Sequence, residues 1–219
     1  MTDRQFDLIV FDWDGTLVDS TALIARCLQD TARDLSLPIP NDQQARYIIG
    51  LGLLDSMKYL FPGLEAERCS EVTARYSYHF LAGHENVQPF NGAADLLATL
   101  NDAGYVVGIA TGKSRRGLER ALELSGLARF FHITRCADEG FPKPHPDMLH
   151  FLMDSVATPV TRTLMIGDTT HDVGMAHNAG ASAVAVSYGA HDKADLIQAT
   201  PLACVDSVAE LAAWLRANG

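Results

Sequence analysis

The feature that most constrains the fold is a short apolar run near the start of the chain, residues 6–11 (FDLIVF). The run stops abruptly at Asp12-Trp13-Asp14-Gly15. A continuous run of this length, without strict alternation of polar and apolar residues, is typical of a central parallel strand with both faces covered. We therefore expect the chain to begin with a buried strand that ends in two carboxylates.

After Pro89 the pattern alternates between strand and helix. Short apolar stretches predict strands at residues 105–110, 131–134, 163–167 and 182–186. Helical spacing and helix-ending glycines predict helices at residues 93–101, 115–125, 146–156, 172–179 and 208–217. Strands separated by helices predict an α/β fold with a doubly wound parallel sheet.

The segment between the first strand and Pro89 has a different pattern. Apolar residues recur at helical spacing over residues 21–81, with breaks at residues 38–40, 50–52 and 62–63. An all-helical block placed after the first strand is best explained as an inserted cap domain. We expect a Rossmann-like core of residues 1–17 and 89–219 and a helical cap of residues 18–88.

Composition narrows the classes of function. Of the 219 residues, 47% are apolar, and 17 Lys plus Arg against 27 Asp plus Glu give a formal net charge of −10. This is the composition of a globular chain, and its negative field disfavours nucleic acid and anionic membranes as partners. No apolar run approaches the roughly 18 residues of a membrane span, and the first residues are too polar for a signal peptide. We therefore expect a cytoplasmic protein.

Spacing argues against three familiar kinds of site. Gly112-Lys113-Ser114 would need a glycine in place of Val107 to form a P-loop. Gly50-Leu51-Gly52 would need a glycine in place of Asp55, and a preceding strand, to bind a dinucleotide. The four cysteines form no Cys-x-x-Cys pair, which argues against a zinc knuckle or a disulfide scaffold and predicts free, mostly buried thiols. These cysteines are Cys27, Cys69, Cys136 and Cys204.

Polar residues follow several of the expected strands or lie in the loops between them. In a doubly wound sheet the loops after the strands converge on one crevice. We therefore expect four carboxylates, one hydroxyl and one ammonium group to meet there. The residues are Asp12 and Asp14 after the first strand, Thr111 and the adjacent Gly112, Lys143 between two prolines, and Asp168 with Asp172.

Carboxylates gathered at one edge repel one another unless a cation shares the site. Ligands that are all oxygen, without Cys or His at ligand spacing, favour Mg²⁺ over zinc. Because Mg²⁺ usually bridges to a phosphate, we expect a phosphorylated substrate whose oxygens face Lys143 and Thr111. Each residue alone has a simpler explanation, such as a helix N-cap for Asp168, and only their coincidence at successive loops favours a site.

The segment FDWDGTLVDS resembles the first motif of the haloacid dehalogenase superfamily of phosphohydrolases. Thr111 matches the second motif of that family, Lys143 in GFPKPHPDM the third, and MIGDTTHD, with Asp168 and Asp172, the fourth. The resemblance covers the whole chain. It is closest to the phosphoglycolate phosphatase-like branch, which carries a helical cap after the first motif.

The resemblance implies a role for each matched residue. Asp12 is expected to be the nucleophile, and Asp14 the general acid and base. The metal ligands are expected to be the Asp12 carboxylate, the Asp14 backbone carbonyl and Asp168, with Asp172 binding the metal or its waters. The phosphoryl group is expected to contact Thr111, the Gly112 amide and Lys143.

The cap is expected to select the substrate, through the loop around Gly50 and Gly52. In the resembling family a comparable loop meets the substrate, and Arg46 lies where many members have a basic residue. The alternative is that the glycines only separate two helices and that Arg46 is solvated. Helical spacing predicts that five aromatic residues pack within the cap. His145 and His171 are expected to have either a phosphate contact or a helix-start or loop role. The aromatic residues are Tyr47, Tyr59, Tyr76, Tyr78 and Phe80.

These expectations combine into one function and two alternatives. The chain is predicted to be a Mg²⁺-dependent phosphatase, a monomer or weak homodimer, that hydrolyses a small phosphorylated metabolite through an aspartyl-phosphate. Phosphoglycolate and sugar phosphates are the expected kinds of substrate. The first alternative is a phosphomutase of the β-phosphoglucomutase type, and the second, from another class, is a phospho-accepting receiver domain. Receiver domains have no cap, and the second aspartate, Asp14, favours catalysis.

Overall fold

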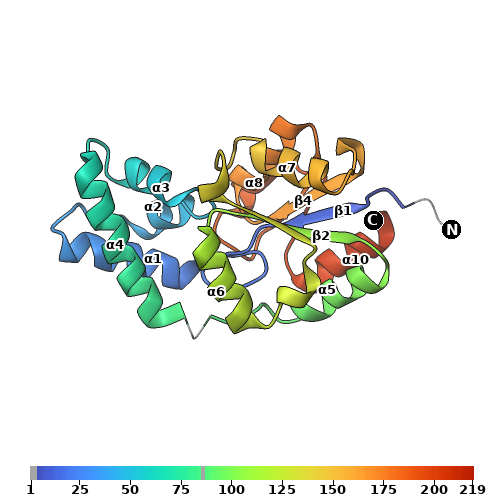
Figure 1. The fold of residues 1–219 in the computed structure, drawn as a ribbon, viewed down its shortest axis with the longest axis horizontal. Coiled ribbons are helices and arrows are strands. Elements are labelled where there is room, and N and C mark those ends of the chain that lie inside the picture. The colour runs from blue at the N-terminus through green and yellow to red at the C-terminus, as the bar shows by residue number, and fades with distance from the viewer. Residues whose placement is uncertain (1–3, 85–86) are drawn as a thin grey trace.

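The structure is a computed structural model that describes residues 4–84 and 87–219 (Figure 1). Within these residues, six parallel strands form one sheet in the order β3-β2-β1-β4-β5-β6. The strands are β1 (Leu8–Phe11), β2 (Val106–Thr111), β3 (Ile133–Cys136), β4 (Thr163–Gly167), β5 (Ser182–Val186) and β6 (Ala203–Val205). The first strand of the chain is therefore central, as the buried apolar run predicted.

Helices cover both faces of the sheet. Alternate residues of β1 point to opposite faces, so that Ile9 and Phe11 belong to one hydrophobic cluster and Leu8 and Val10 to another. The first cluster includes residues of α5 (Ala93–Asp102), α6 (Arg115–Ser125) and α10 (Val208–Asn218). The second includes residues of α7 (Asp147–Ser155), α8 (Thr170–Ala179) and α9 (Lys193–Gln198). This arrangement confirms the predicted doubly wound α/β fold.

Four helices form a separate layer beyond one end of the sheet, away from both termini (Figure 1). They are α1 (Thr21–Asp34), α2 (Asp42–Tyr47), α3 (Leu53–Leu60) and α4 (Ala66–Gly83), and they share a hydrophobic cluster around Leu28, Met57 and Val72. A β-bridge joins Val18 to Pro89, so the two segments that connect the sheet to these four helices lie side by side. We retain residues 18–88 as the proposed cap.

Sequence and structure differ most near the C-terminus. The strands expected at residues 163–167 and 182–186 coincide with β4 and β5. The short strand β6 and helix α9 were not predicted. All four cysteines are free; three are buried and Cys204 is partly buried, as their spacing predicted.

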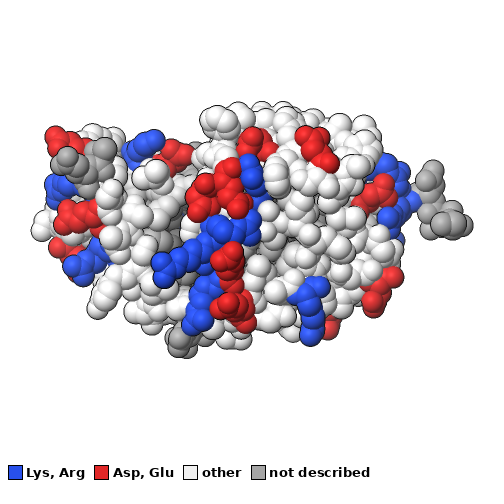
Figure 2. All heavy atoms as spheres, in the orientation of Figure 1, with Lys and Arg blue, Asp and Glu red and all other residues white. Residues whose placement is uncertain are grey.

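The surface carries both signs of charge. Figure 2 shows a face on which acidic and basic side chains lie next to one another. Ion pairs such as Arg115 with Glu139, at 2.8 Å, join residues of opposite sign. Within the described residues, no helix combines the length and the apolar character that crossing a membrane requires.

Candidate active site

The candidate site lies where the winding of the sheet changes direction. β1 is hydrogen-bonded to β2 on one side and to β4 on the other. Asp12 follows β1, Thr111 ends β2 and Asp168 follows β4, so their loops leave the same edge of the sheet. Such a switch point is where α/β sheets open a crevice for ligands.

Three carboxylates meet in this crevice. Oxygen atoms of Asp12, Asp168 and Asp172 lie within 4.8 Å of one another, and all three residues are buried. The Lys143 ammonium group lies 2.9 Å from Asp12 Oδ1 and 2.7 Å from Asp172 Oδ1. Lys143 itself is only 2% exposed. The structure thus places three acidic groups and one basic group out of contact with bulk water.

Within the described part of the chain, hydrogen bonds or the ion pairs with Lys143 occupy most of these oxygens, but Asp12 Oδ2 has neither. Thr16 Oγ1 and the Ala190 N–H donate to the two oxygens of Asp168, each at 2.7 Å. The Trp13 N–H donates to Asp12 Oδ1 at 2.6 Å. Asp12 Oδ2 is buried and accepts no hydrogen bond from any described residue. An unpartnered buried carboxylate oxygen is costly, so this atom calls for a ligand.

The electrostatics also favour a bound cation. Burial, together with the neighbouring carboxylates, raises the pKa of Asp12 and of Asp168. Burial opposes the charge of Lys143, but Asp12 and Asp172 outweigh it and raise the pKa of the ammonium group. One ammonium group does not balance three carboxylates at this distance, and oxygen ligands suit Mg²⁺. The residues present therefore fit the expected metal ion.

A glycine is required where β1 turns into the site. Gly15 has a φ of +77°, a conformation that side chains disfavour. A Cβ atom at this position would overlap the Asp168 carboxylate. The Asp-x-Asp-Gly pattern therefore brings the turn close to Asp168.

Asp14 is held apart from this carboxylate cluster. Ser20 Oγ donates to Asp14 Oδ1 at 2.6 Å, and Lys113 Nζ lies 3.0 Å from Asp14 Oδ2. The same ammonium group lies 4.7 Å from the centre of the Phe80 ring on α4. The sequence analysis considered Lys113 only as part of a P-loop pattern that is incomplete. Its position directly after Thr111-Gly112 could have indicated that it belongs to the site.

The loop between α2 and α3, residues 48–52, lies directly on the site; we refer to it as the cap loop. A Cβ atom added at Gly112 would lie 2.5 Å from Leu51 O and 2.7 Å from Gly50 O. One added at Gly50 would lie 3.7 Å from Asp12 Oδ2. One added at Gly52 would lie 3.2 Å from Pro142 Cβ. The two cap glycines thus face core residues, including the expected nucleophile.

Arg46 is placed differently from the two glycines. Its guanidinium group lies 2.8 Å from Asp42 Oδ2 and donates to Thr21 Oγ1 at 3.2 Å. Both partners belong to helices of the cap. Its expected role toward substrate stays a prediction.

Residues 9–186 match the family described as haloacid dehalogenase-like hydrolase. The chain belongs to this family. The match spans β1 to β5 and therefore includes every motif residue of the site.

Relatives within the family are named as phosphatases. The chain is 35% identical over 212 residues to "Probable phosphatase IndB" of Dickeya dadantii, covering 93% of this chain and 91% of the relative. It is 32% identical to the pyrophosphatase PpaX of Halalkalibacterium halodurans, with 84% and 85% covered. It is 28% identical to the phosphoglycolate phosphatase of Vibrio parahaemolyticus, with 96% of each covered. This chain is accordingly an enzyme, a phosphatase of the haloacid dehalogenase-like family, as its motifs predicted.

Solved structures agree with the fold. A hydrolase from Pseudomonas syringae superposes with a TM-score of 0.88 at 23% identity, covering 97% of this chain and 98% of the other. A haloacid dehalogenase-like family hydrolase from Streptococcus pneumoniae gives 0.81 at 27% identity, with 96% and 98% covered. These similarities extend over the core and the cap.

Two histidines of the core form hydrogen bonds with the cap. His171 on α8 and His191 after β5 both donate from Nε2 to the backbone carbonyl of Tyr47, at 2.8 and 2.9 Å. Burial lowers the pKa of His171 to about 4 and also lowers that of His191, so both rings are neutral near pH 7. His191 was not singled out in the sequence. His145 instead accepts the Asp147 N–H at the start of α7, in line with the expected helix-start role.

The aromatic residues of the cap divide into two groups. Tyr76 and Phe80 pack against the cap cluster, as predicted. The prediction is wrong for Tyr47, Tyr59 and Tyr78, which are 40%, 53% and 64% exposed. Tyr47 instead stacks on His191 of the core, and its ring also lies against Tyr59.

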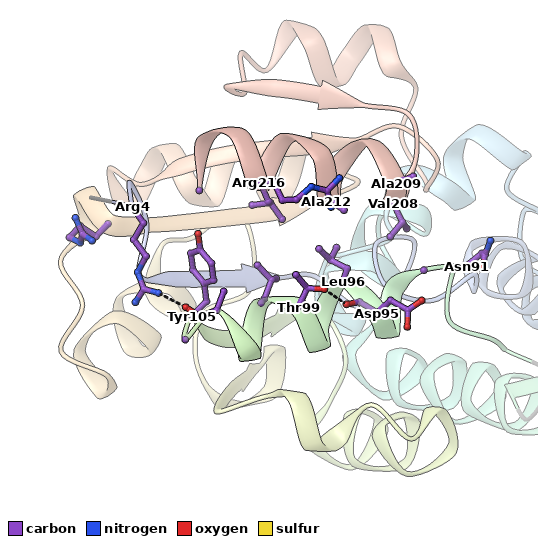
Figure 3. A pocket seen from close by; sticks show the side chains of 17 residues that line it. Arg4, Asn91, Asp95, Leu96, Thr99, Tyr105, Val208, Ala209, Ala212 and Arg216 are labelled. Carbon is purple, nitrogen blue, oxygen red and sulfur yellow. Dashed lines mark hydrogen bonds between the residues drawn. The ribbon is translucent and has the colours of Figure 1, made fainter. Parts of the chain in front are cut away.

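A hollow runs along one face of the core, between α5 and α10 (Figure 3). Arg4, Tyr105 and Arg162 line it, and each precedes a strand rather than following one. None of the motif residues is among the described residues that line this hollow. The hollow is therefore separate from the carboxylate cluster.

Proposed function

We propose that this phosphatase requires Mg²⁺ and hydrolyses a small phosphorylated metabolite through an aspartyl-phosphate on Asp12. The observation that carries the proposal is the buried, unpartnered Asp12 Oδ2 beside Asp168, Asp172 and Lys143. A hard cation and a phosphoryl group together would satisfy this arrangement of charge. Phosphoglycolate and sugar phosphates remain the expected kinds of substrate, and one of the named relatives, the phosphoglycolate phosphatase, supports the first of these.

The proposed reaction has two steps, and both aspartates of the first motif take part in each. An oxygen of Asp12 attacks the phosphorus while the bond to the leaving oxygen breaks, and Asp14 gives that oxygen a proton. Asp14 then takes a proton from a water molecule that attacks the same phosphorus, which frees phosphate and restores the Asp12 carboxylate. Two smaller steps replace one difficult displacement. Ser20 and Lys113 contact the two oxygens of Asp14 and fix the orientation of this side chain.

The metal would be held by core residues alone. Its proposed ligands are the carboxylates of Asp12 and Asp168 and the backbone carbonyl of Asp14, with Asp172 orienting its waters. When bound, Mg²⁺ would neutralise negative charge on the phosphoryl oxygens. Lys143, Thr111 and the Gly112 amide are proposed to hold those oxygens in line with Asp12.

The cap is proposed to choose the leaving group. The cap loop lies over Asp12 and Gly112, so a substrate must fit beneath it. Gly50 and Gly52 permit this close approach, and Arg46 is proposed to contribute positive charge near the entrance. The enzyme is proposed to act in the cytoplasm as a monomer or weak homodimer.

The test is a panel of phosphorylated metabolites together with p-nitrophenyl phosphate, assayed with Mg²⁺ and with EDTA. We expect continuous phosphate release that needs Mg²⁺ and is lost in Asp12→Asn. The matched control is Asp19→Asn, because Asp19 is an exposed aspartate in the same segment. Turnover retained by Asp12→Asn would overturn the proposal.

The same assay separates the alternatives. A receiver domain would take up label once, in a stoichiometric amount, without continued release. A phosphomutase would convert one sugar phosphate into its isomer with little free phosphate. Either outcome would contradict the proposed hydrolysis.

A further inference from the structure

The backbone carbonyl of Tyr47 receives two hydrogen bonds from parts of the core that are far apart in sequence. His171 Nε2 lies 2.8 Å from this oxygen and His191 Nε2 lies 2.9 Å from it. The Tyr47 ring also stacks on His191, with ring centres 5.4 Å apart, and meets His171 edge to face at 5.2 Å. Both the backbone and the side chain of Tyr47 therefore contact the two core histidines.

The proton on Nε2 of both rings can be assigned from the shared partner. A carbonyl oxygen only accepts, so each Nε2 must carry the proton that is donated to Tyr47. His191 Nδ1 accepts the Thr170 N–H at 3.1 Å, which agrees with a proton on Nε2. Each ring therefore donates one hydrogen bond from Nε2 to the Tyr47 carbonyl. This satisfies a carbonyl at the C-terminal end of α2 that the helix itself leaves unpaired.

The position of Tyr47 links this contact to the active site. Tyr47 is the last residue of α2, and the cap loop follows it directly. On the core side, His171 precedes Asp172, and His191 donates its backbone N–H to the Asp168 carbonyl at 3.3 Å. The two histidines thus connect the carboxylate cluster to the segment that covers Asp12.

We propose that His171 and His191 are positioning residues that clamp Tyr47 and thereby hold the cap loop over the reacting phosphoryl group. This inference rests on the proposed phosphatase function of the same site. The histidines touch neither substrate nor metal in this role; they act through the backbone of residues 47–52. Their contribution is to the closed arrangement of cap and core, which binds substrate.

The experiment replaces each histidine with phenylalanine, which keeps a ring but removes the donor. A lost buried hydrogen bond lowers kcat/KM by about three- to tenfold. We expect the loss to appear as a raised KM, because a loosened cap binds substrate less well. Loss of folded enzyme would instead lower kcat and leave KM unchanged. His171→Gln and His191→Gln restore an N–H donor and should recover part of the loss, and His150→Phe, an exposed histidine on α7, should match the wild type.

Amide hydrogen exchange supplies a readout that does not need activity. In the double variant His171→Phe/His191→Phe, the peptide containing residues 47–52 should exchange faster while β1 and β4 stay protected. A KM and a loop exchange rate that both match the wild type would overturn the proposal. Faster exchange with an unchanged KM would overturn it too, because the histidines would then hold only the cap structure. An inactive wild type would contradict the proposed function, whereas the exchange experiment would still test the clamp.

Discussion

The core contributes charged side chains to the candidate active site, whereas the cap contributes mainly backbone atoms and glycines. Asp12, Asp168 and Lys143 are each at most 2% exposed; Lys143 pairs with Asp12, and Thr16 donates a hydrogen bond to Asp168. The cap approaches Asp12 through Gly50, and its Tyr47 carbonyl accepts hydrogen bonds from the core histidines His171 and His191. The difference indicates a division of labour in which the core performs the chemistry and the cap controls access to it.

The largest expected effect comes from removing the buried cation of the core. Lys143→Met would leave Asp12 and Asp172 without their shared partner, so turnover should fall by at least about a thousandfold. The uncompensated carboxylates should also lower the free energy of unfolding by about 3–5 kcal/mol. Activity assays and urea unfolding measure the two effects.

The control for this substitution is Lys58→Met in the cap. Lys58 is 70% exposed and pairs only at the surface with Asp55. Both turnover and unfolding should stay near the wild type. A Lys143→Met variant as active as Lys58→Met would break the proposed distinction between core and cap.

Mg²⁺ binding should raise the free energy of unfolding through the carboxylates of the core. At 100 times its Kd, Mg²⁺ should raise the free energy of unfolding by about 2.7 kcal/mol, because it binds the folded carboxylate cluster and not the unfolded chain. Asp168→Asn should lose this gain, whereas Arg46→Ala should keep it. Thermal unfolding with Mg²⁺ and with EDTA measures the difference, and equal gains in both variants would argue against Asp168 as a ligand.

A methyl group at the contact between cap and core should weaken substrate binding. Gly112→Ala would place Cβ against the carbonyls of Leu51 and Gly50, so the cap loop must move away. We expect KM to rise by about tenfold, since small displacements at a closed site are costly. Gly117→Ala on α6 is the matched control, because its Cβ would approach Ser114 Oγ at 3.3 Å and no cap atom within 4 Å. Unchanged kinetics in Gly112→Ala would show that the loop contact has no role in binding.

The smallest effect is expected from the charged side chain of the cap itself. Arg46→Ala removes an ion pair with an Asp42 side chain that is 68% exposed, so stability should change by less than about 0.5 kcal/mol. KM for the physiological substrate should rise while kcat stays close to the wild type. Steady-state kinetics on the substrate found in the panel will test this. Unaltered values would reduce Arg46 to a structural residue of α2.

Much of the core could be predicted because its signals are local. The apolar runs of β4 and β5 are buried and end at polar residues, so their bounds could be located from sequence. β6 has only three residues, at the edge of the sheet, and its position depends on pairing with β5 rather than on any periodicity of its own. Short edge strands of this kind carry too few residues for a pattern to appear.

The contacts between cap and core could be predicted only in outline. The two glycines indicated a loop near the site. The atoms that meet there are backbone carbonyls, and every residue has one, so the residue types do not predict this contact. His191 became visible only when folding brought it beside Tyr47, 144 residues away in sequence. Lys113 was hidden in the same way, since its partner Asp14 lies on another strand end.

The central claim is that Asp12 carries the phosphoryl group during turnover. Rapid acid quenching of the enzyme with substrate and Mg²⁺, followed by borohydride reduction and peptide mass spectrometry, tests it directly. An aspartyl-phosphate at Asp12 is reduced to homoserine, so we predict homoserine at position 12 and an unmodified Asp14. Rapid turnover with no modification at position 12, or modification at another residue, would contradict the account.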